Sequence, residues 1–247
     1  MKPSFEESER GPLLVWAKPD HELQYVIFVD AASGMRGTTD YSVIKVLECR
    51  DMREVACWRS NKCGPDQVAS KAMCLGYHYN VALIGAETEK WGSFIMFFLA
   101  QQNYPNLYTR VRYGRVRQGG QKDMLGTELG WRTDLKTRDW MFGTGMTAVN
   151  EGVCQINSVN QLREMREIFR DEMGKPRHPK NGNDDEVMAW LGALMMRDAA
   201  YSRKLVVNKP KPPQTEAEKQ EAWVTDLVRE YSEDHPDKDD DTAWLEW

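Results

Sequence analysis

The sequence has few of the residues that form zinc sites or disulfide scaffolds. Five cysteines occur among 247 residues, an odd number with no Cys-x-x-Cys pair, and four histidines are scattered along the chain. A disulfide-stabilised secreted domain needs paired cysteines, and a structural zinc site needs closely spaced Cys and His ligands. The composition therefore argues against both and favours a reducing, cytosolic setting.

Long apolar runs are also missing. No stretch approaches the roughly 18 apolar residues of a membrane-spanning helix, and the opening residues 1–12 lack the apolar segment of a secretory signal. No Gly-x-x-x-x-Gly-Lys-Ser/Thr loop occurs either. The sequence thus predicts no membrane partner and no P-loop nucleotide site.

Negative charge is concentrated at one end. The chain carries −5 at pH 7, whereas residues 209–247 alone carry −7, which leaves the preceding residues at +2. The body must therefore be judged separately as a nucleic-acid binder. We expect a lead-in over residues 1–22, a domain over 23–205 and an acidic linker and tail over 206–247. The linker begins at the stiff segment Lys-Pro-Lys-Pro-Pro, and the tail has the spacing of a short amphipathic helix over 216–231.

Hydrophobic patterning predicts an α/β domain. Three strand-like runs, residues 25–31, 41–48 and 54–60, are joined by short polar connections, which favours an antiparallel meander. The run Val81–Ala86 is apolar throughout, as in a strand buried on both faces of a partly parallel sheet. Helices are predicted to start at Gly64-Pro65, over 92–102, 137–150 and 159–173, and at Asn183. The expected fold is a mixed sheet, a meander followed by parallel strands, flanked by helices.

Acidic residues follow two of the buried strands and start the last helix. Asp30 and Glu87 each end an apolar run, and Asp184 and Asp185 precede the helix that starts near Asn183. Ligands bind at the carboxyl edge of α/β sheets, and several carboxylates meeting there would repel one another without a cation. We therefore predict two divalent ions, Mg²⁺ or Mn²⁺, which prefer oxygen ligands and promote phosphodiester cleavage in pairs.

Each acid also has a simpler interpretation. Asp30 could cap a turn with Ser33 and Gly34, Glu87 could be a solvated strand end, and Asp184 could be an ordinary helix N-cap. The order and placement of all of them together favour the metal site. His78 and His178 are interpreted as ordinary helix-end and loop histidines rather than catalytic bases.

The segment Thr109–Lys122 carries five positive charges and no acid. The pairs Arg110/Arg112 and Arg115/Arg117 alternate with other residues around Gly114, which would place each pair on one face of a strand or hairpin. Together with Lys122 they could line a phosphate backbone. The alternative is a solvated sheet edge that its charge protects from aggregation.

Several motifs resemble the nuclease domain of the large terminases, the DNA-packaging motors of tailed bacteriophages. The opening motif is Val29-Asp-Ala-Ala-Ser-Gly34 with Thr39-Asp-Tyr-Ser42. The remaining segments, in chain order, are Glu87–Gly92, Tyr104–Tyr108, Gly130–Thr133 with Thr137-Arg138, and Gly182–Ala189. The resemblance covers about residues 20–200 and is carried by the order of the motifs rather than by any one of them.

The resemblance implies an RNase H-like fold and an endonuclease that cleaves double-stranded DNA with two divalent metals. It assigns metal binding and catalysis to Asp30, Glu87 and Asp184. Asp185 would be a further ligand and Asp40 a supporting acid outside the ligands. Arg138 stands where the family usually has lysine and would contact DNA.

Some positions depart from the family pattern. Glu89 stands where many relatives have asparagine and is a rival to Glu87, and Asn183 stands where histidine is frequent. The ATPase half of a terminase is also missing. We therefore expect either an excised nuclease domain or a separately encoded one, and we expect an isolated nuclease domain to be a monomer.

The resemblance also implies a setting and partners. We expect the host cytoplasm, double-stranded DNA as substrate, and contact of the tail with the portal or another packaging component. Two alternatives remain open at this point. One is a non-catalytic DNA-binding or packaging-assembly module of the same fold, and the other is an actin-like phosphotransferase or ATPase, which Asp30–Gly34 with Thr38-Thr39 faintly resembles.

Overall fold

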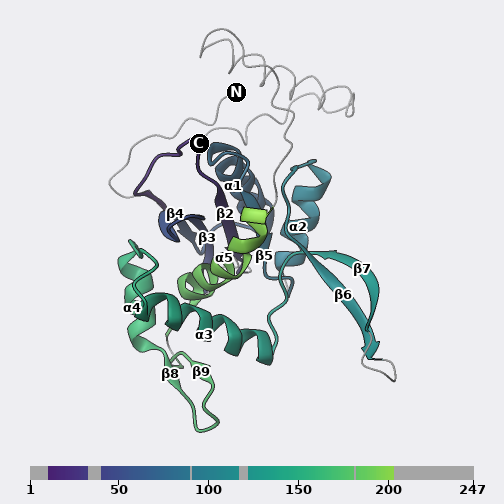
Figure 1. Cartoon of the computed structure of the whole chain (residues 1–247). Coiled ribbons are helices and arrows are strands. Elements are labelled where there is room, and N and C mark those ends of the chain that lie inside the picture. The colour runs from purple at the N-terminus through teal and green to yellow at the C-terminus, as the bar shows by residue number, and fades with distance from the viewer. Residues whose placement is uncertain (1–10, 33–39, 90, 117–121, 181, 203–247) are drawn as a thin grey trace, which may run out of the picture. The chain divides into compact units, whose positions relative to one another are not determined.

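Five strands form the central sheet, in the order β1-β4-β3-β2-β5 (Figure 1). They are β1 Leu13–Val15, β2 Tyr25–Asp30, β3 Ser42–Glu48, β4 Arg53–Ser60 and β5 Leu83–Ala86. Neighbouring strands run antiparallel except β2 and β5, which are parallel. The predicted mixed sheet, a meander followed by a parallel strand, is confirmed.

The computed structural model describes residues 11–32, 40–89, 91–116, 122–180 and 182–202, without the side chains of 112–125, 201 and 202. Described residues from Pro12 onwards fall in one compact unit, Pro12–Arg203. The segment predicted as a lead-in contributes β1, because Leu13 to Val15 pair with β4. The sheet therefore begins before the boundary drawn at residue 23. The predicted tail, 206–247, lies outside the described residues.

Helices cover both faces of the sheet, as the alternation of side chains along β2 requires. Ile27 and Val29 pack in one hydrophobic cluster with α1 (Pro65–His78) and α2 (Trp91–Gln101). Val26 and Phe28 pack in a second cluster with α3 (Leu135–Asn150) and α5 (Asp185–Ser202). A strand buried on both faces explains why residues 25–29 are uniformly apolar.

The last helix lies very close to the sheet. A Cβ atom added at Gly192 of α5 would lie 2.5 Å from ring carbons of Phe28 in β2. Glycine therefore permits the close approach that brings the start of α5 to the edge where β2 ends.

The helix predicted over residues 159–173 is shorter than expected. α4 covers Val159–Glu167, and β8 (Phe169–Arg170) and β9 (Pro176–Arg177) follow as a small hairpin. Asp171 closes its turn by accepting backbone hydrogen bonds from Met173 and Lys175, and Gly174 adopts φ +76°. Side-chain capping of a turn thus overrides the helical pattern.

The other hairpin, β6 (Thr109–Val116) with β7 (Lys122–Leu129), extends away from the sheet (Figure 1). Among the described residues, no helix has both the length and the apolar character needed to cross a bilayer.

Candidate active site

Asp30 and Glu87 lie side by side because their strands are parallel neighbours. Val29 of β2 is in register with Ala86 of β5, and the next residue of each strand is the acid. The backbone N–H of Glu87 donates to the carbonyl oxygen of Val29 at 3.3 Å. Both side chains therefore emerge at the carboxyl edge of the sheet, where ligands bind in α/β folds.

The start of α5 reaches the same edge. Asp184 immediately precedes α5 and Asp185 is its first residue. The backbone N–H of Tyr41, which precedes β3, donates to Oδ2 of Asp185 at 3.1 Å. This hydrogen bond joins the helix start to residues 144 positions earlier in the chain.

The electrostatics of Asp30 show that the four acids converge. Burial raises the pKa of the Asp30 carboxyl well above its ordinary value, and the charges of Glu87, Asp185 and Asp184 raise it further. Arg138 opposes the shift. Such interactions weaken with distance, so these side chains lie in the same part of the molecule. Asp30, Glu87, Asp184 and Asp185 therefore share one negative region.

Glu87 and Asp185 respond to the same crowding. Burial raises the pKa of Glu87, and the charges of Glu89 and Asp184 add to the shift. Burial also raises the pKa of Asp185 to about 6, the hydrogen bond from Tyr41 opposes the shift, and Asp184 and Asp40 add to it. Asp40, predicted as a supporting acid, is exposed and acts on Asp185 in this way.

A cation already lies among these acids. Nη2 of Arg138 donates to Oδ2 of Asp184 at 2.5 Å, and its guanidinium lies 5.2 Å from the centroid of the Phe142 ring. The predicted DNA-binding arginine is thus part of the acidic site itself.

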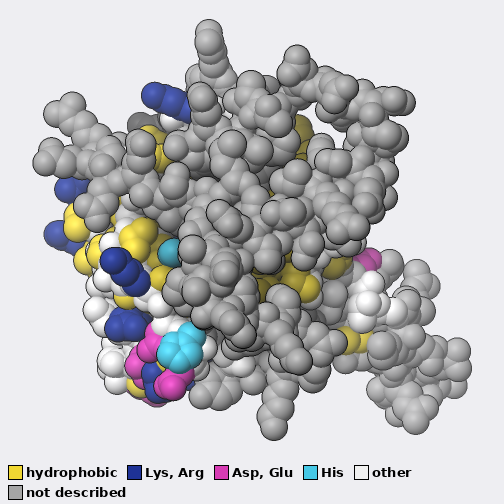
Figure 2. Space-filling view, turned by 90° about the horizontal axis from the view of Figure 1, so that it is seen from above, with side chains coloured by type: hydrophobic (Ala, Val, Ile, Leu, Met, Phe, Trp, Pro, Cys, Tyr) yellow, Lys and Arg dark blue, Asp and Glu magenta, His cyan; other side chains and the backbone are white. Residues whose placement is uncertain are grey.

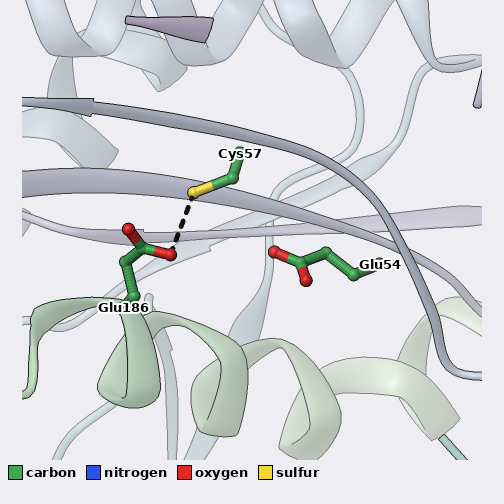
Figure 3. Close-up of side chains that lie close together, drawn as sticks. All are labelled: Glu54, Cys57 and Glu186. Atoms are coloured by element: carbon green, nitrogen blue, oxygen red, sulfur yellow. Dashed lines mark hydrogen bonds between the residues drawn. The ribbon is translucent and has the colours of Figure 1, made fainter. Parts of the chain in front are cut away.

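A second acidic cluster lies inside the protein, where Glu54, Cys57 and Glu186 place ligand atoms within 4.8 Å of one another (Figure 3). In the described parts of the chain, no other three acidic, Cys or His residues meet this distance. The position is already neutralised, because Nζ of Lys45 lies 2.5 Å from Oε1 of Glu54 and 3.0 Å from Oε2 of Glu186. A buried ammonium takes the place that a metal would need, so we assign this cluster a structural role.

The predicted DNA-binding segment contributes strand β6 and the first residue of β7 to the β6–β7 hairpin. The register shifts between Arg112 and Tyr113, which interrupts the alternation expected along the strand. Arg110 is ion-paired with Glu128 of β7. Arg117 and the side chains of Arg112, Arg115 and Lys122 lie outside the described parts of the structure. On the face shown in Figure 2, basic, acidic and hydrophobic side chains are mixed among the described residues.

No protein-family model and no curated protein matches the chain. Solved structures do match. The large terminase nuclease of thermophilic phage G20c with bound magnesium has a TM-score of 0.59 at 19% identity, over 76% of this chain and 89% of that chain. The large terminase nuclease domain of Thermus phage P74-26 has a TM-score of 0.58 at 19% identity, over 76% of this chain and 87% of that chain.

The fold is that of a terminase nuclease. A further structure of the G20c nuclease gives a TM-score of 0.55 at 21% identity, over 76% of this chain and 90% of that chain. That protein has also been solved with bound cobalt and with bound zinc. The RNase H-like fold implied by the motifs is thereby confirmed, while the activity has to follow from the residues of this chain.

Within the terminase nuclease fold, two neighbours of the acids can now be placed. Glu89, the rival of Glu87, is exposed, whereas Glu87 is partly buried at the sheet edge. His178, interpreted from the sequence as an ordinary loop residue, has Nε2 3.8 Å from Oδ1 of Asp184. That interpretation missed a contact with the site, because nothing in the local sequence shows that the loop after β9 returns to it.

Proposed function

We propose that this chain is a metal-dependent endonuclease that cleaves double-stranded DNA during viral genome packaging in the host cytoplasm. The observation that carries the proposal is geometric: Asp30 and Glu87 emerge from adjacent parallel strands at one sheet edge, and the hydrogen bond from Tyr41 to Asp185 brings the start of α5 to the same edge. Nucleases that hydrolyse phosphodiesters with metal ions need such a group of carboxylates.

The donor atoms of these residues suit divalent ions, although no three of the four place ligand atoms within 4.8 Å of one another in this structure. Carboxylate oxygens are the donors that Mg²⁺ and Mn²⁺ prefer, and burying several acids together is costly unless a cation neutralises them. We propose that Asp30, Glu87, Asp184 and Asp185 hold two ions. Bound there, the ions would activate a water molecule and stabilise the leaving oxygen. The solved G20c nuclease with bound magnesium supports the proposal that this fold binds a divalent ion.

The protein groups around the acids have separate tasks in this proposal. Tyr41 orients Asp185 through its backbone N–H. Arg138 would bind the DNA phosphate next to the acids. The β6–β7 hairpin would hold the backbone further along the duplex without reading its sequence. The predicted contact of the tail with a packaging component falls on residues outside the described parts and stays a prediction.

Cleavage of supercoiled plasmid tests the proposal. Wild-type protein should nick and linearise the plasmid with MnCl₂ or MgCl₂ and lose this activity in EDTA. Asp30→Asn and Asp184→Asn should each abolish cleavage, whereas Glu89→Gln, which removes the exposed neighbouring acid, should retain it. Circular dichroism checks that each variant is folded.

Two outcomes would contradict the proposal. Cleavage that persists in Asp30→Asn would show that the reaction does not depend on the proposed group of acids. A retarded plasmid without nicks under all metal conditions would favour the non-catalytic DNA-binding module.

A truncation that lacks residues 209–247 should cleave like the full chain, because the proposed acids and hairpin all precede it.

A further inference from the structure

The first turn of α5 rests on a network of buried charges that the proposed reaction does not use. Lys45 of β3 and Glu54 of β4 are fully buried, and Glu186 of α5 is 1% exposed. The ammonium of Lys45 bonds to both carboxylates. Glu186 directly follows Asp184 and Asp185. We propose that Glu186, held by this network, is a positioning residue that fixes these two acids for metal binding, an inference that rests on the proposed function.

Contacts from two other parts of the chain meet at Glu186. Ser158, the N-cap of α4, donates from Oγ to Oε2 of Glu186 at 2.5 Å. Glu164 of α4 accepts with Oε2 from the backbone N–H of Glu186 at 2.8 Å and of Val187 at 3.1 Å. A side chain of α4 therefore caps the N-terminus of α5, where backbone donors have no partner within the helix. Both the side chain and the backbone of Glu186 are fixed.

The network is better suited to fixing position than to stabilising the fold. Burying three charges costs several kcal/mol each, and buried ion pairs often contribute little net stability compared with apolar residues. The charges do restrict the position of Glu186, however, because its carboxylate must bond to Lys45 and Ser158 at the same time. Two residues before it, Asp184 makes the first helical hydrogen bond by accepting from the N–H of Met188 at 2.8 Å. A shift of Glu186 would therefore move Asp184 and Asp185 with it.

Glu54 supplies a matched control. It bonds the same ammonium and is equally buried, but it lies on β4 and also accepts from the backbone N–H groups of Asn157 and Ser158. Replacing either Glu54 or Glu186 by leucine leaves Lys45 with one carboxylate and changes the charge of the network equally. Only Glu186→Leu removes a side-chain tether of α5, while the backbone N–H groups of residues 186 and 187 can still donate to Glu164.

Isothermal titration with MnCl₂ on the full chain is the experiment, with urea denaturation run in parallel. Replacing a residue that contacts a metal ligand typically weakens metal binding by about tenfold to a hundredfold. We expect Glu186→Leu to raise the Kd for Mn²⁺ by about tenfold or more. Glu54→Leu should lose at least as much stability with a Kd within about threefold of wild type. Ser158→Ala, a milder change, should weaken Mn²⁺ binding in the same direction. Equal Kd changes in the two leucine variants, or none in Glu186→Leu, would overturn the proposal.

Hydrogen exchange separates this inference from the proposed function. If wild-type protein binds no Mn²⁺, the proposed function fails. Hydrogen exchange at the Val187 and Met188 amides still tests whether the side chain of Glu186 holds the first turn of α5. Exchange there should be faster in Glu186→Leu than in Glu54→Leu at matched global stability. Equal exchange rates in the two variants would reject the anchoring role.

Discussion

Arg138 donates a hydrogen bond to Asp184 at 2.5 Å, and its positive charge opposes the rise in the pKa of Asp30. One guanidinium thus offsets part of the repulsion among four carboxylates. In the proposed function, a divalent cation would act on the same carboxylates, so arginine and metal would compete for Asp184 until a DNA phosphate offered the arginine another partner.

Removing this arginine should therefore change metal and DNA binding in opposite directions. In Arg138→Ala, Mn²⁺ should bind about tenfold more tightly without DNA, equivalent to about 1.4 kcal/mol, because a competing charge is gone. DNA binding should weaken. Titration calorimetry with MnCl₂ measures the first and fluorescence anisotropy with a short duplex the second. Arg163→Ala, which removes an exposed charge of α4, is the control, and an identical response in both variants would refute the competition.

Gly92 should prove essential for the position of Glu87. A Cβ atom at residue 92 would lie 1.6 Å from the carbonyl oxygen of Glu87, so the start of α2 or the strand end must move. Gly92→Ala should destabilise the protein by about 2 kcal/mol or more and weaken Mn²⁺ binding. Gly143→Ala is the control, because nothing lies within 4 Å of its added Cβ. Within α3 that change should stabilise by about 0.5–1 kcal/mol. Urea denaturation checks both, and equal stability of Gly92→Ala and wild type would contradict the clash.

Glu164 should make stability fall as pH rises. Burial raises the pKa of its carboxyl to about 7, with Glu186 and Asp185 adding to the shift and the N–H of Val187 and Arg59 opposing it. The unfolded chain loses this proton near pH 4.5, whereas the folded protein keeps it until about pH 7. Between these two pH values, unfolding therefore releases a proton from Glu164, and the free energy of unfolding falls as the pH rises. The loss of stability is absent below pH 4.5, grows between pH 4.5 and 7, and reaches its full size above pH 7.

This loss of stability amounts to at most roughly 3 kcal/mol. Glu164→Gln lacks this titration, so its stability relative to wild type should improve from pH 4.5 to 7.5. Denaturation curves across that range measure the difference, and a constant difference between the two proteins would show that Glu164 titrates normally.

The hairpin should bind DNA through phosphates alone. Affinity should fall steeply with salt, and Arg115→Ala should reduce the slope of log K against log salt concentration by about 0.9. Arg110→Ala should reduce it less, because Glu128 already pairs with Arg110. Anisotropy titrations at several salt concentrations with two unrelated duplexes provide the test. A flat salt dependence, or a strong preference for one duplex, would exclude this mode of binding.

Much of the site could be predicted because its acids lie at the ends of strands and helices that a short stretch of sequence is enough to identify. Asp30 and Glu87 each close an apolar run, and the parallel pairing of those runs places the acids together. The sequence left a strand or a hairpin open for residues 109–122, and the structure shows a hairpin whose register shifts between Arg112 and Tyr113. The end of α4 was misplaced, because hydrogen bonds of Asp171 stop the helical pattern before residue 173.

The sequence by itself determined strands β2 to β5 and the acids at the ends of β2 and β5, since these depend on the short-range periodicity of burial. Only the tertiary structure decided what those acids meet. Lys45 stands in an apolar strand and finds Glu186 141 positions away, and His178 reaches Asp184 from a loop. Such pairings depend on how distant segments pack, and the cost of burying a charge is met only where a partner from another element arrives.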